Sequence, residues 1–247
     1  MPYARTHQFP KMRTWLRRLL ILALVVVGDP IPESLLAGSI LILLGQILHF
    51  IAAGTLVKTE VLTIAGPYRW VRNPFYFSNL LTDAGFCVVA WNPWVPLVWF
   101  PYFYGFVIHP RTKSEEAELL EIHGKAYQDY LDRVPRYVPG LFPKYPHVRG
   151  ALNWDALRRN REFPRQLRHW AFLLVLFAKD RLVTLQGGNR WSLEGLPKLR
   201  EDIPAVAALG AGVAMILAPW VAKLIFGKKK KTGTHPVPAP QGPEPRP

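Results

Sequence analysis

Two short polar stretches contain the side chains best suited to chemistry. The first is Gly66-Pro67-Tyr68-Arg69 followed by Arg72-Asn73-Pro74-Phe75-Tyr76. The second contains, in order, Glu115, Glu116, Gly124, Tyr127, Tyr130 and Arg136. Arginines bind carboxylates or phosphates, and carboxylates bind cationic groups. Each stretch adjoins the end of an apolar segment, so a hairpin of those segments brings both stretches to one membrane interface, where we expect a shared site.

The second stretch is predicted to be a helix from Thr112 to about Val134. Thr112 and Glu115 have the spacing of a capping box at its start. At 100° per residue, one face of this helix contains Glu116, Leu119, His123, Tyr127, Tyr130 and Val134. Glu116 therefore lies on an apolar face, where a carboxylate must be paired or bound to a cation. A first-turn glutamate favoured by the helix dipole is the alternative interpretation.

The first stretch is predicted to be a loop. Gly66-Pro67 favours a turn, and Pro74 excludes helical geometry at Asn73. Such a loop leaves backbone groups free to hold a polar ligand. Arg69 and Arg72 either bind an anionic ligand there or act only as topology determinants.

Other polar residues have simpler interpretations. His109, Glu116 and His123 lack a recognised ligand spacing, so no metal site is expected. Gln46 and His49 share a helical face inside an apolar segment, and we expect them to bond to neighbouring helices.

Composition favours a membrane protein. Half of the 247 residues are apolar, and the apolar run from Ser34 to Val57 reaches roughly 36 Å as a helix, enough to cross a bilayer. The net charge of +14 follows the membrane sides rather than one helix face, so nucleic acid is not expected as a partner. Cys87 is the only cysteine, which excludes disulfides within the chain and Cys-based zinc sites.

The predicted fold is an all-α polytopic membrane helical bundle with about six spans and a cytoplasmic cofactor pocket. The expected spans are Trp15 to Val27, Ser34 to Val57, Phe75 to Trp91, Trp94 to Ile108, Leu167 to Leu185 and Ile203 to Phe226. Lysine and arginine are absent from the loops at 28–33 and 92–96 and frequent elsewhere, so both polar stretches and both termini are predicted to be cytoplasmic. Lys179, Asp180 and Arg181 make the fifth span the weakest, since charges inside a bilayer are costly.

Four regions follow from this pattern. Residues 1–33 form a basic N-terminus with a short first span, and residues 34–146 form the membrane core with both polar stretches. Residues 147–231 form a C-terminal extension with one or two spans, expected to act as an anchor. Residues 232–247 are rich in proline and predicted to be disordered.

The ordered set of motifs resembles the integral-membrane methyltransferases typified by isoprenylcysteine carboxyl methyltransferase and phospholipid N-methyltransferase. That family has a Gly-Pro-Tyr-Arg turn, an Arg-His-Pro-x-Tyr run, a hairpin and a glutamate pair, followed by glycine, two tyrosines and an Arg-x-x-Pro run. Gly66 to Arg69, Arg72 to Tyr76, Glu115-Glu116, Gly124, Tyr127, Tyr130 and Arg136 with Pro139 correspond to it.

The resemblance implies a cytosol-facing pocket for S-adenosylmethionine and a lipophilic methyl acceptor that enters from the bilayer. It assigns catalytic roles to Arg136 and Glu116. It assigns cofactor binding to Gly66, Pro67, Tyr68, Arg69, Arg72, Asn73, Pro74, Tyr76, Glu115 and Glu116. The acceptor stays open between a prenylated cysteine carboxylate, a phospholipid amine and a lipophilic thiol.

Two positions depart from the family pattern. Asn73 replaces a histidine, and Ser78 replaces a common glycine, which would narrow the approach of the cofactor to the helix. Membrane sterol reductases that use NADPH share part of the first stretch but have an acid at the position of Asn79. A non-catalytic membrane protein that retains the fold is a third interpretation.

Overall fold

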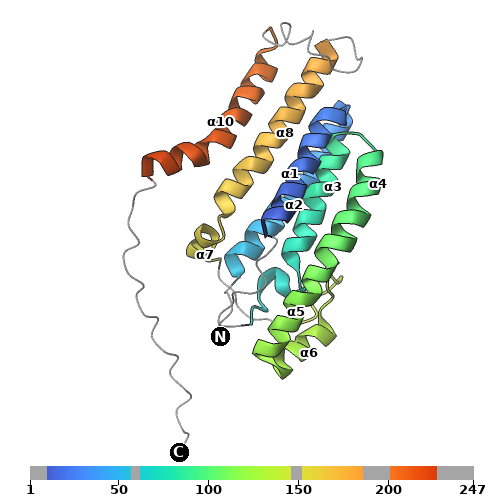
Figure 1. Cartoon of the computed structure of the whole chain (residues 1–247), viewed down its shortest axis with the longest axis vertical. Coiled ribbons are helices and arrows are strands. Elements are labelled where there is room, and N and C mark those ends of the chain that lie inside the picture. The colour runs from blue at the N-terminus through green and yellow to red at the C-terminus, as the bar shows by residue number, and fades with distance from the viewer. Residues whose placement is uncertain (1–9, 57–61, 146–151, 186–200, 227–247) are drawn as a thin grey trace, which may run out of the picture.

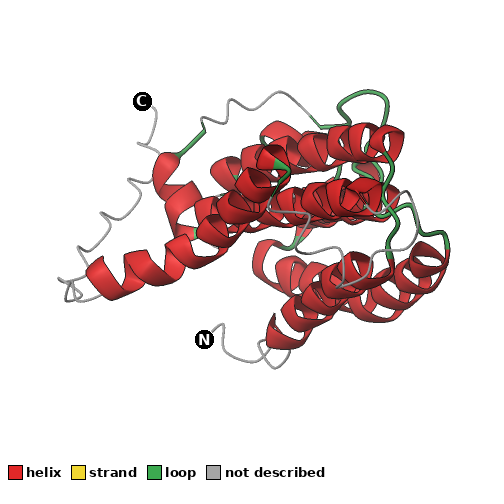
Figure 2. Ribbon diagram, turned by 90° about the horizontal axis from the view of Figure 1, so that it is seen from above, coloured by secondary structure: helices red, strands yellow, loops and turns green. Residues whose placement is uncertain are grey.

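The computed structural model describes residues 10–56, 62–145, 152–185 and 201–226, and within these ranges it contains helices and no strand. Figures 1 and 2 show the long helices packed side by side. Their bounds are α1 (Pro10–Val27), α2 (Pro32–Thr55), η1 (Gly66–Arg69), α3 (Pro74–Val89), α4 (Trp94–Trp99), a π-helix (Phe100–Ile108), α5 (His109–His123), α6 (Lys125–Arg133), α7 (Trp154–Arg159), α8 (Glu162–Leu185) and α10 (Ile203–Phe226). The predicted all-α class is confirmed for the described residues.

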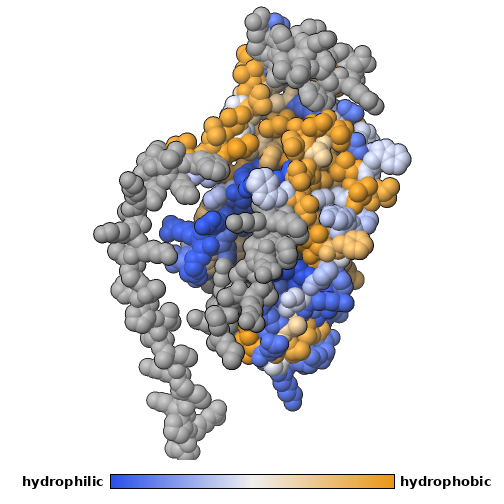
Figure 3. Space-filling model, viewed as in Figure 1, coloured by the Kyte–Doolittle hydropathy of each residue, from blue (hydrophilic) through white to orange (hydrophobic). Residues whose placement is uncertain are grey.

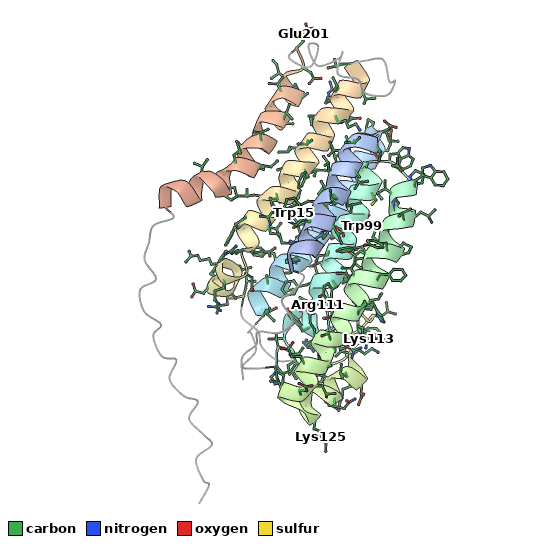
Figure 4. All side chains as sticks on the ribbon, viewed as in Figure 1. Trp15, Trp99, Arg111, Lys113, Lys125 and Glu201 are labelled. Atoms are coloured by element: carbon green, nitrogen blue, oxygen red, sulfur yellow. The ribbon has the colours of Figure 1, made fainter. Side chains whose placement is uncertain are left out.

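One described helix, α2, is both long and apolar enough to cross a membrane, and α10 contains a shorter apolar helix over Ile203–Pro219. The expected number of six spans stays a prediction. In the face shown in Figure 3, apolar residues cover much of the upper half, whereas the lower end around α5 and α6 is largely hydrophilic. Figure 4 places Arg111, Lys113 and Lys125 in the lower part and Glu201 at the opposite end. The predicted domain of residues 232–247 lies outside the described residues.

The α2–α3 pair forms the centre of the bundle because glycines let the two backbones approach closely. A Cβ added at Gly38 would meet the Gly85 carbonyl oxygen at 2.5 Å, and one at Gly45 would meet the Ser78 carbonyl oxygen at 2.7 Å. Ser78 itself is fully buried and its hydroxyl donates to the Phe75 carbonyl. The Ser78 side chain therefore packs at the helix crossing, and the expectation that it narrows the cofactor's approach stays a prediction.

The charged side chains Lys179 and Arg181 of α8 have partners on neighbouring segments. The Lys179 ammonium donates to carbonyl oxygens at the C-terminal end of α1, at 2.7 Å from Val25 and 3.2 Å from Val26, and also to Gly28. A cation at a helix C-terminus satisfies carbonyls that lack helical partners. Arg181 pairs with Asp202 at 2.8 Å, so two of the charges that weakened this predicted span have partners.

The helix predicted from Thr112 to Val134 is interrupted, which corrects that expectation. The helical run begins earlier, at Trp94, and continues through the π-helix into α5. It ends at Gly124, whose φ of 54° and ψ of −129° suit glycine alone, and α6 follows at once. Thr112 therefore lies within the helix, where its hydroxyl donates to the Ile108 carbonyl at 3.0 Å. The predicted capping box is wrong.

Candidate functional site

The two polar stretches meet at one end of the bundle, as their sequence positions predicted. Hydrogen bonds join the loop at 66–76 to the segment after α5. They run from Arg72 N to Pro135 O at 2.8 Å, from Gly140 N to Trp70 O at 3.2 Å, from Lys144 N to Arg69 O at 2.9 Å and from Tyr130 Oη to Tyr68 O at 2.7 Å. Three of these bonds are between backbone groups, so the loop is held in place largely independently of its side chains.

Glu116 lies at the centre of this meeting point and is 6% exposed. Arg136 contacts both of its carboxylate oxygens, with Nε at 3.1 and 3.0 Å and Nη2 at 2.8 Å. Arg72 Nε lies 3.5 Å from the carboxylate. The predicted burial of Glu116 is confirmed, and the chain's own arginines supply the required positive charge. Its burial is therefore explained without a cationic cofactor.

Arg136 is fixed by this pair while part of it stays accessible. Its side chain is 31% exposed, against 8% for that of Glu116. The hydrogen bonds that Arg136 donates to Glu116 raise the pKa of the Arg136 guanidinium above its usual value, although burial acts in the opposite direction. The guanidinium is thus a permanent cation with a defined orientation, suited to binding a carboxylate.

Asn73 connects both stretches through its side-chain amide. Its Nδ2 donates to Glu116 Oε1 at 3.4 Å and to the Arg136 carbonyl at 3.2 Å. With φ −119° and ψ 65°, Asn73 is outside the helix that begins at Pro74, as predicted. A neutral amide therefore occupies the place of the family's histidine as a hydrogen-bond donor.

Glu115 has different partners from Glu116. It accepts from Tyr76 Oη at 3.0 Å and from Arg111 Nε at 2.8 Å. Its side chain is 34% exposed. The two neighbouring glutamates therefore differ in accessibility, with Glu115 open to solvent and Glu116 enclosed by arginines.

The turn at 66–69 packs against the end of α2. Gly66 has φ +54°, and an added Cβ would meet Thr55 at 3.0 Å, so glycine fits this position on both counts. Burial raises the pKa of Tyr68 well above its usual value, and Arg69 Nε donates to the Tyr145 carbonyl at 3.1 Å. These contacts hold the turn over the end of the bundle.

A groove of about 480 Å³ opens along this turn. Its lining residues are Leu48, Ile51, Gly66, Pro67, Arg69, Trp70, Val71, Phe77 and Pro139. The groove thus combines apolar side chains of the α2 and α3 helices with the predicted cofactor loop.

Sequence reasoning missed a second polar cluster within the bundle. Gln46 and His49 bond to neighbouring helices as predicted, through Thr82 at 3.1 Å and Glu162 at 3.0 Å. Their wider network includes Arg17 and Asp83, which pair at 2.5 Å. The signal in the sequence was Asp83, an acid inside an otherwise apolar segment.

Comparisons with known proteins agree with the resemblance stated from the motifs. The sequence model of the isoprenylcysteine carboxyl methyltransferase (ICMT) family matches residues 34–121. No solved structure matches the chain.

Curated relatives match about half of the chain or less. "Protein-S-isoprenylcysteine O-methyltransferase" of Dictyostelium discoideum is 29% identical over 116 residues, covering 42% of this chain and 48% of that protein. The protein of the same name from Mus musculus is 29% identical over 129 residues, covering 52% and 43%. That from Rattus norvegicus is 30% identical over 115 residues, covering 42% and 40%.

The chain therefore spans less than half the length of these curated relatives. The match to the family model ends before Arg136 and excludes α7, α8 and α10. Within these limits the family recognition made from the motifs is confirmed as a similarity to the ICMT family over residues 34–121.

Proposed function

We propose that this chain is a membrane-embedded methyltransferase that uses S-adenosylmethionine to methylate the carboxylate of a lipophilic acceptor such as a prenylated cysteine. The observation that supports this most directly is the Arg136–Glu116 pair, with Nη2 2.8 Å from the carboxylate, at the junction of both motif stretches. The family match and the named relatives give the chemical class.

The residues present suit a methyl donor that has ammonium, carboxylate and ribose groups. Glu115, 34% exposed, is free to accept further hydrogen bonds from an ammonium or hydroxyl group. Arg72 Nε is buried and forms no hydrogen bond in the described structure, although Glu116 lies 3.5 Å away. When bound, S-adenosylmethionine supplies an electrophilic methyl group on a sulfonium for in-line displacement. We assign the donor to Gly66, Pro67, Tyr68, Arg69, Arg72, Asn73, Pro74, Tyr76, Glu115 and Glu116.

Arg136 is assigned to the acceptor carboxylate, and Glu116 to holding Arg136 in place. A carboxylic acid is ionised at neutral pH because its pKa is near ~4. Its oxygen is therefore already nucleophilic, and the site has only to orient it and exclude water. A fixed arginine provides that orientation without a general base.

The arginines also favour a carboxylate over the other acceptors considered. A phospholipid amine is a cation at neutral pH and would have to lose a proton before it could accept a methyl group. Arg72 and Arg136 both face Glu116, and their positive charge opposes a cationic acceptor. Arginine pairs with a carboxylate through two parallel hydrogen bonds.

The groove beside the turn suits the apolar part of such an acceptor. Its volume of about 480 Å³ lies within the roughly 300–1,000 Å³ of small-molecule sites. Leu48 and Ile51 belong to α2, the helix long and apolar enough to span. An acceptor dissolved in the bilayer could therefore slide along α2 towards the loop at 66–76.

The alternative NADPH-dependent reductase is less well supported. The resemblance to reductases expects an acid at the position of Asn79. Here the Asn79 amide oxygen accepts from Arg17 at 2.9 Å and from Arg165 at 3.1 Å. These bonds occupy Asn79 within the helix bundle, so it is not available to a nicotinamide cofactor.

The test is methyl transfer by purified full-length chain in detergent or vesicles. S-adenosylmethionine with a labelled methyl group is offered with an N-acylated farnesyl cysteine, a phosphatidylethanolamine or a long-chain thiol. A carboxylate methyl ester releases its label as methanol in mild alkali, whereas N- and S-methyl products retain it. We expect alkali-labile label with the cysteine substrate. Alkali-stable label would contradict the carboxylate assignment, and sterol reduction with NADPH but no methyl transfer would favour the reductase.

A further inference from the structure

The second polar cluster consists of two ion pairs joined by one amide. Arg17 on α1 pairs with Asp83 on α3 at 2.5 Å, and Arg165 pairs with Glu162 on α8 at 3.1 Å. The Asn79 oxygen accepts from both arginines. The pairs balance one another in charge, and each carboxylate side chain is at most 1% exposed. Such buried charges are costly in a membrane protein and usually have a functional role.

Glu162 is the link between this cluster and the motif loop. His49 Nδ1 lies 3.0 Å from its carboxylate, and the His49 ring packs on Phe75 at 4.6 Å between centroids. Phe75 belongs to the motif Arg72-Asn73-Pro74-Phe75-Tyr76, and its ring is perpendicular to that of Tyr68 at 6.5 Å.

Tyr68 completes the connection to the second motif stretch. Its carbonyl accepts from Tyr130 Oη at 2.7 Å. A continuous series of contacts therefore runs from α8 through α2 and the loop to α6. Three contacts lead from α8 to the turn: Glu162 with His49, His49 with Phe75, and Phe75 with Tyr68. All of these side chains are buried or half-buried.

The segment before α8 is fixed on α2 at the same end. Asn153 N donates to the Gly54 carbonyl at 2.9 Å, and Asn160 Nδ2 donates to the Ala53 carbonyl at 2.9 Å. Gln166 Nε2 donates to the Gln46 carbonyl at 3.2 Å. The first two bonds satisfy carbonyls at the C-terminal end of α2, and the third contacts the middle of α2, so α7 and α8 are fixed to the helix that supports the turn.

We propose that Glu162 and His49 are positioning residues that set the place of Phe75, and with it the loop at 66–76, in the methyl-transfer site. The helices α7 and α8 lie outside the matched segment 34–121, and this assignment gives them a part in catalysis in place of the expected role of an anchor. The inference rests on the proposed function.

The test compares variants that separate the two contacts of His49. His49→Phe keeps a ring against Phe75 but loses the bond to Glu162, whereas His49→Gln keeps a polar group but loses the ring. Glu162→Gln weakens the link from the other side. Asp155→Asn on α7 is the matched control because the Asp155 side chain is 74% exposed. For each purified variant, kcat, KM, the affinity for S-adenosylhomocysteine and hydrogen exchange of the peptide at 66–76 are measured on folded protein.

We expect faster exchange at 66–76 and a fall in kcat of about ten- to a hundredfold for Glu162→Gln and His49→Gln. His49→Phe should be the milder His49 variant, and Asp155→Asn should match wild type. Unchanged exchange and kinetics with only a lower Tm would overturn the inference and leave α8 as an anchor. A smaller fall in kcat for His49→Gln than for His49→Phe would also overturn the inference, because the ring contact with Phe75 would then not matter.

The two proposals fail in different ways. Absence of methyl transfer by the wild-type chain contradicts the proposed function, and the exchange of the peptide at 66–76 then still tests the coupling. Active wild-type protein with unaffected Glu162→Gln and His49→Gln contradicts this inference alone.

Discussion

Arg136 and Glu116 form a two-point ion pair between the segment after α6 and the middle of α5, with Arg136 Nε at 3.1 and 3.0 Å from the two oxygens and Nη2 at 2.8 Å from one. Asn73 and Arg72 approach the same carboxylate from the motif loop. One buried acid thus holds three polar side chains from two distant parts of the chain. Changes to this acid or its partners should therefore affect both the site and the stability of the fold around it.

Arg136→Lys keeps the positive charge but removes the planar fork that contacts both oxygens. We expect kcat/KM for the carboxylate acceptor to fall at least about tenfold, because one lost charge-assisted hydrogen bond costs about 1.5–3 kcal/mol. The affinity for S-adenosylhomocysteine should change less. Arg133→Lys is the control, since the Arg133 side chain is 55% exposed and forms its ion pair with Asp129 rather than with Glu116. Equal kinetics for the two variants would refute the role given to Arg136.

Asn73→Asp places a second carboxylate beside Glu116, where the present amide nitrogen lies 3.4 Å from Oε1. Like charges at this distance repel, so we expect a lower Tm and weaker catalysis. Asn73→His restores the family's residue and should retain activity. Methyl transfer and thermal unfolding of both variants check this. An Asn73→Asp protein as active as wild type would mean that Asn73 does not lie in the working site.

Gly124→Ala tests the break between α5 and α6. The residue has φ 54° and no heavy atom within 4 Å of an added Cβ, so the substitution introduces backbone strain without a steric clash. We expect destabilisation of about 1–3 kcal/mol. Gly105→Ala is a matched control, because an added Cβ there also meets nothing within 4 Å and no positive φ applies. Similar urea midpoints for the two variants would contradict the helix break.

The buried tyrosines of the site predict loss of stability in alkali. Burial raises the pKa of Tyr68 and of Tyr130 in the folded protein. In the unfolded chain, the tyrosine pKa is near ~10. The folded state thus binds these protons more tightly, and its stability should fall as the pH rises above about 10. Tm measured from pH 7 to 11 should show a shallower alkaline fall for Tyr130→Phe than for wild type. Identical slopes would contradict the assigned burial.

Much of the helical framework could be predicted because apolar length and proline positions are local signals. The predicted Ser34 to Val57 agrees with α2 at Pro32–Thr55, and Ile203 to Phe226 agrees with α10. The hairpin break predicted at Asn92-Pro93-Trp94 agrees with the structure, where Asn92 and Pro93 lie between α3 and α4 and Trp94 begins α4. The burial of Glu116 was also predicted from helical periodicity.

The remaining features depend on contacts between distant residues. Helical periodicity continues across Gly124, so it could not reveal the positive φ that separates α5 from α6. Arg17 and Asp83 are 66 positions apart, and His49 and Glu162 are 113 apart. No local pattern predicts which buried charges pair. The arginine partners of Glu116 were likewise visible only once the loop and the helix end were placed together.

The most direct test of the site is the affinity of purified full-length chain for S-adenosylmethionine and S-adenosylhomocysteine, compared between wild type, Glu116→Gln and Glu121→Gln. Glu116→Gln leaves Arg72 and Arg136 without their countercharge, so both ligands should bind at least about tenfold more weakly, and the cationic S-adenosylmethionine should lose more. Glu121 is exposed on the same helix, and Glu121→Gln should bind as wild type does. Failure of the wild-type chain to bind either ligand, or unchanged affinity in Glu116→Gln, would contradict the account.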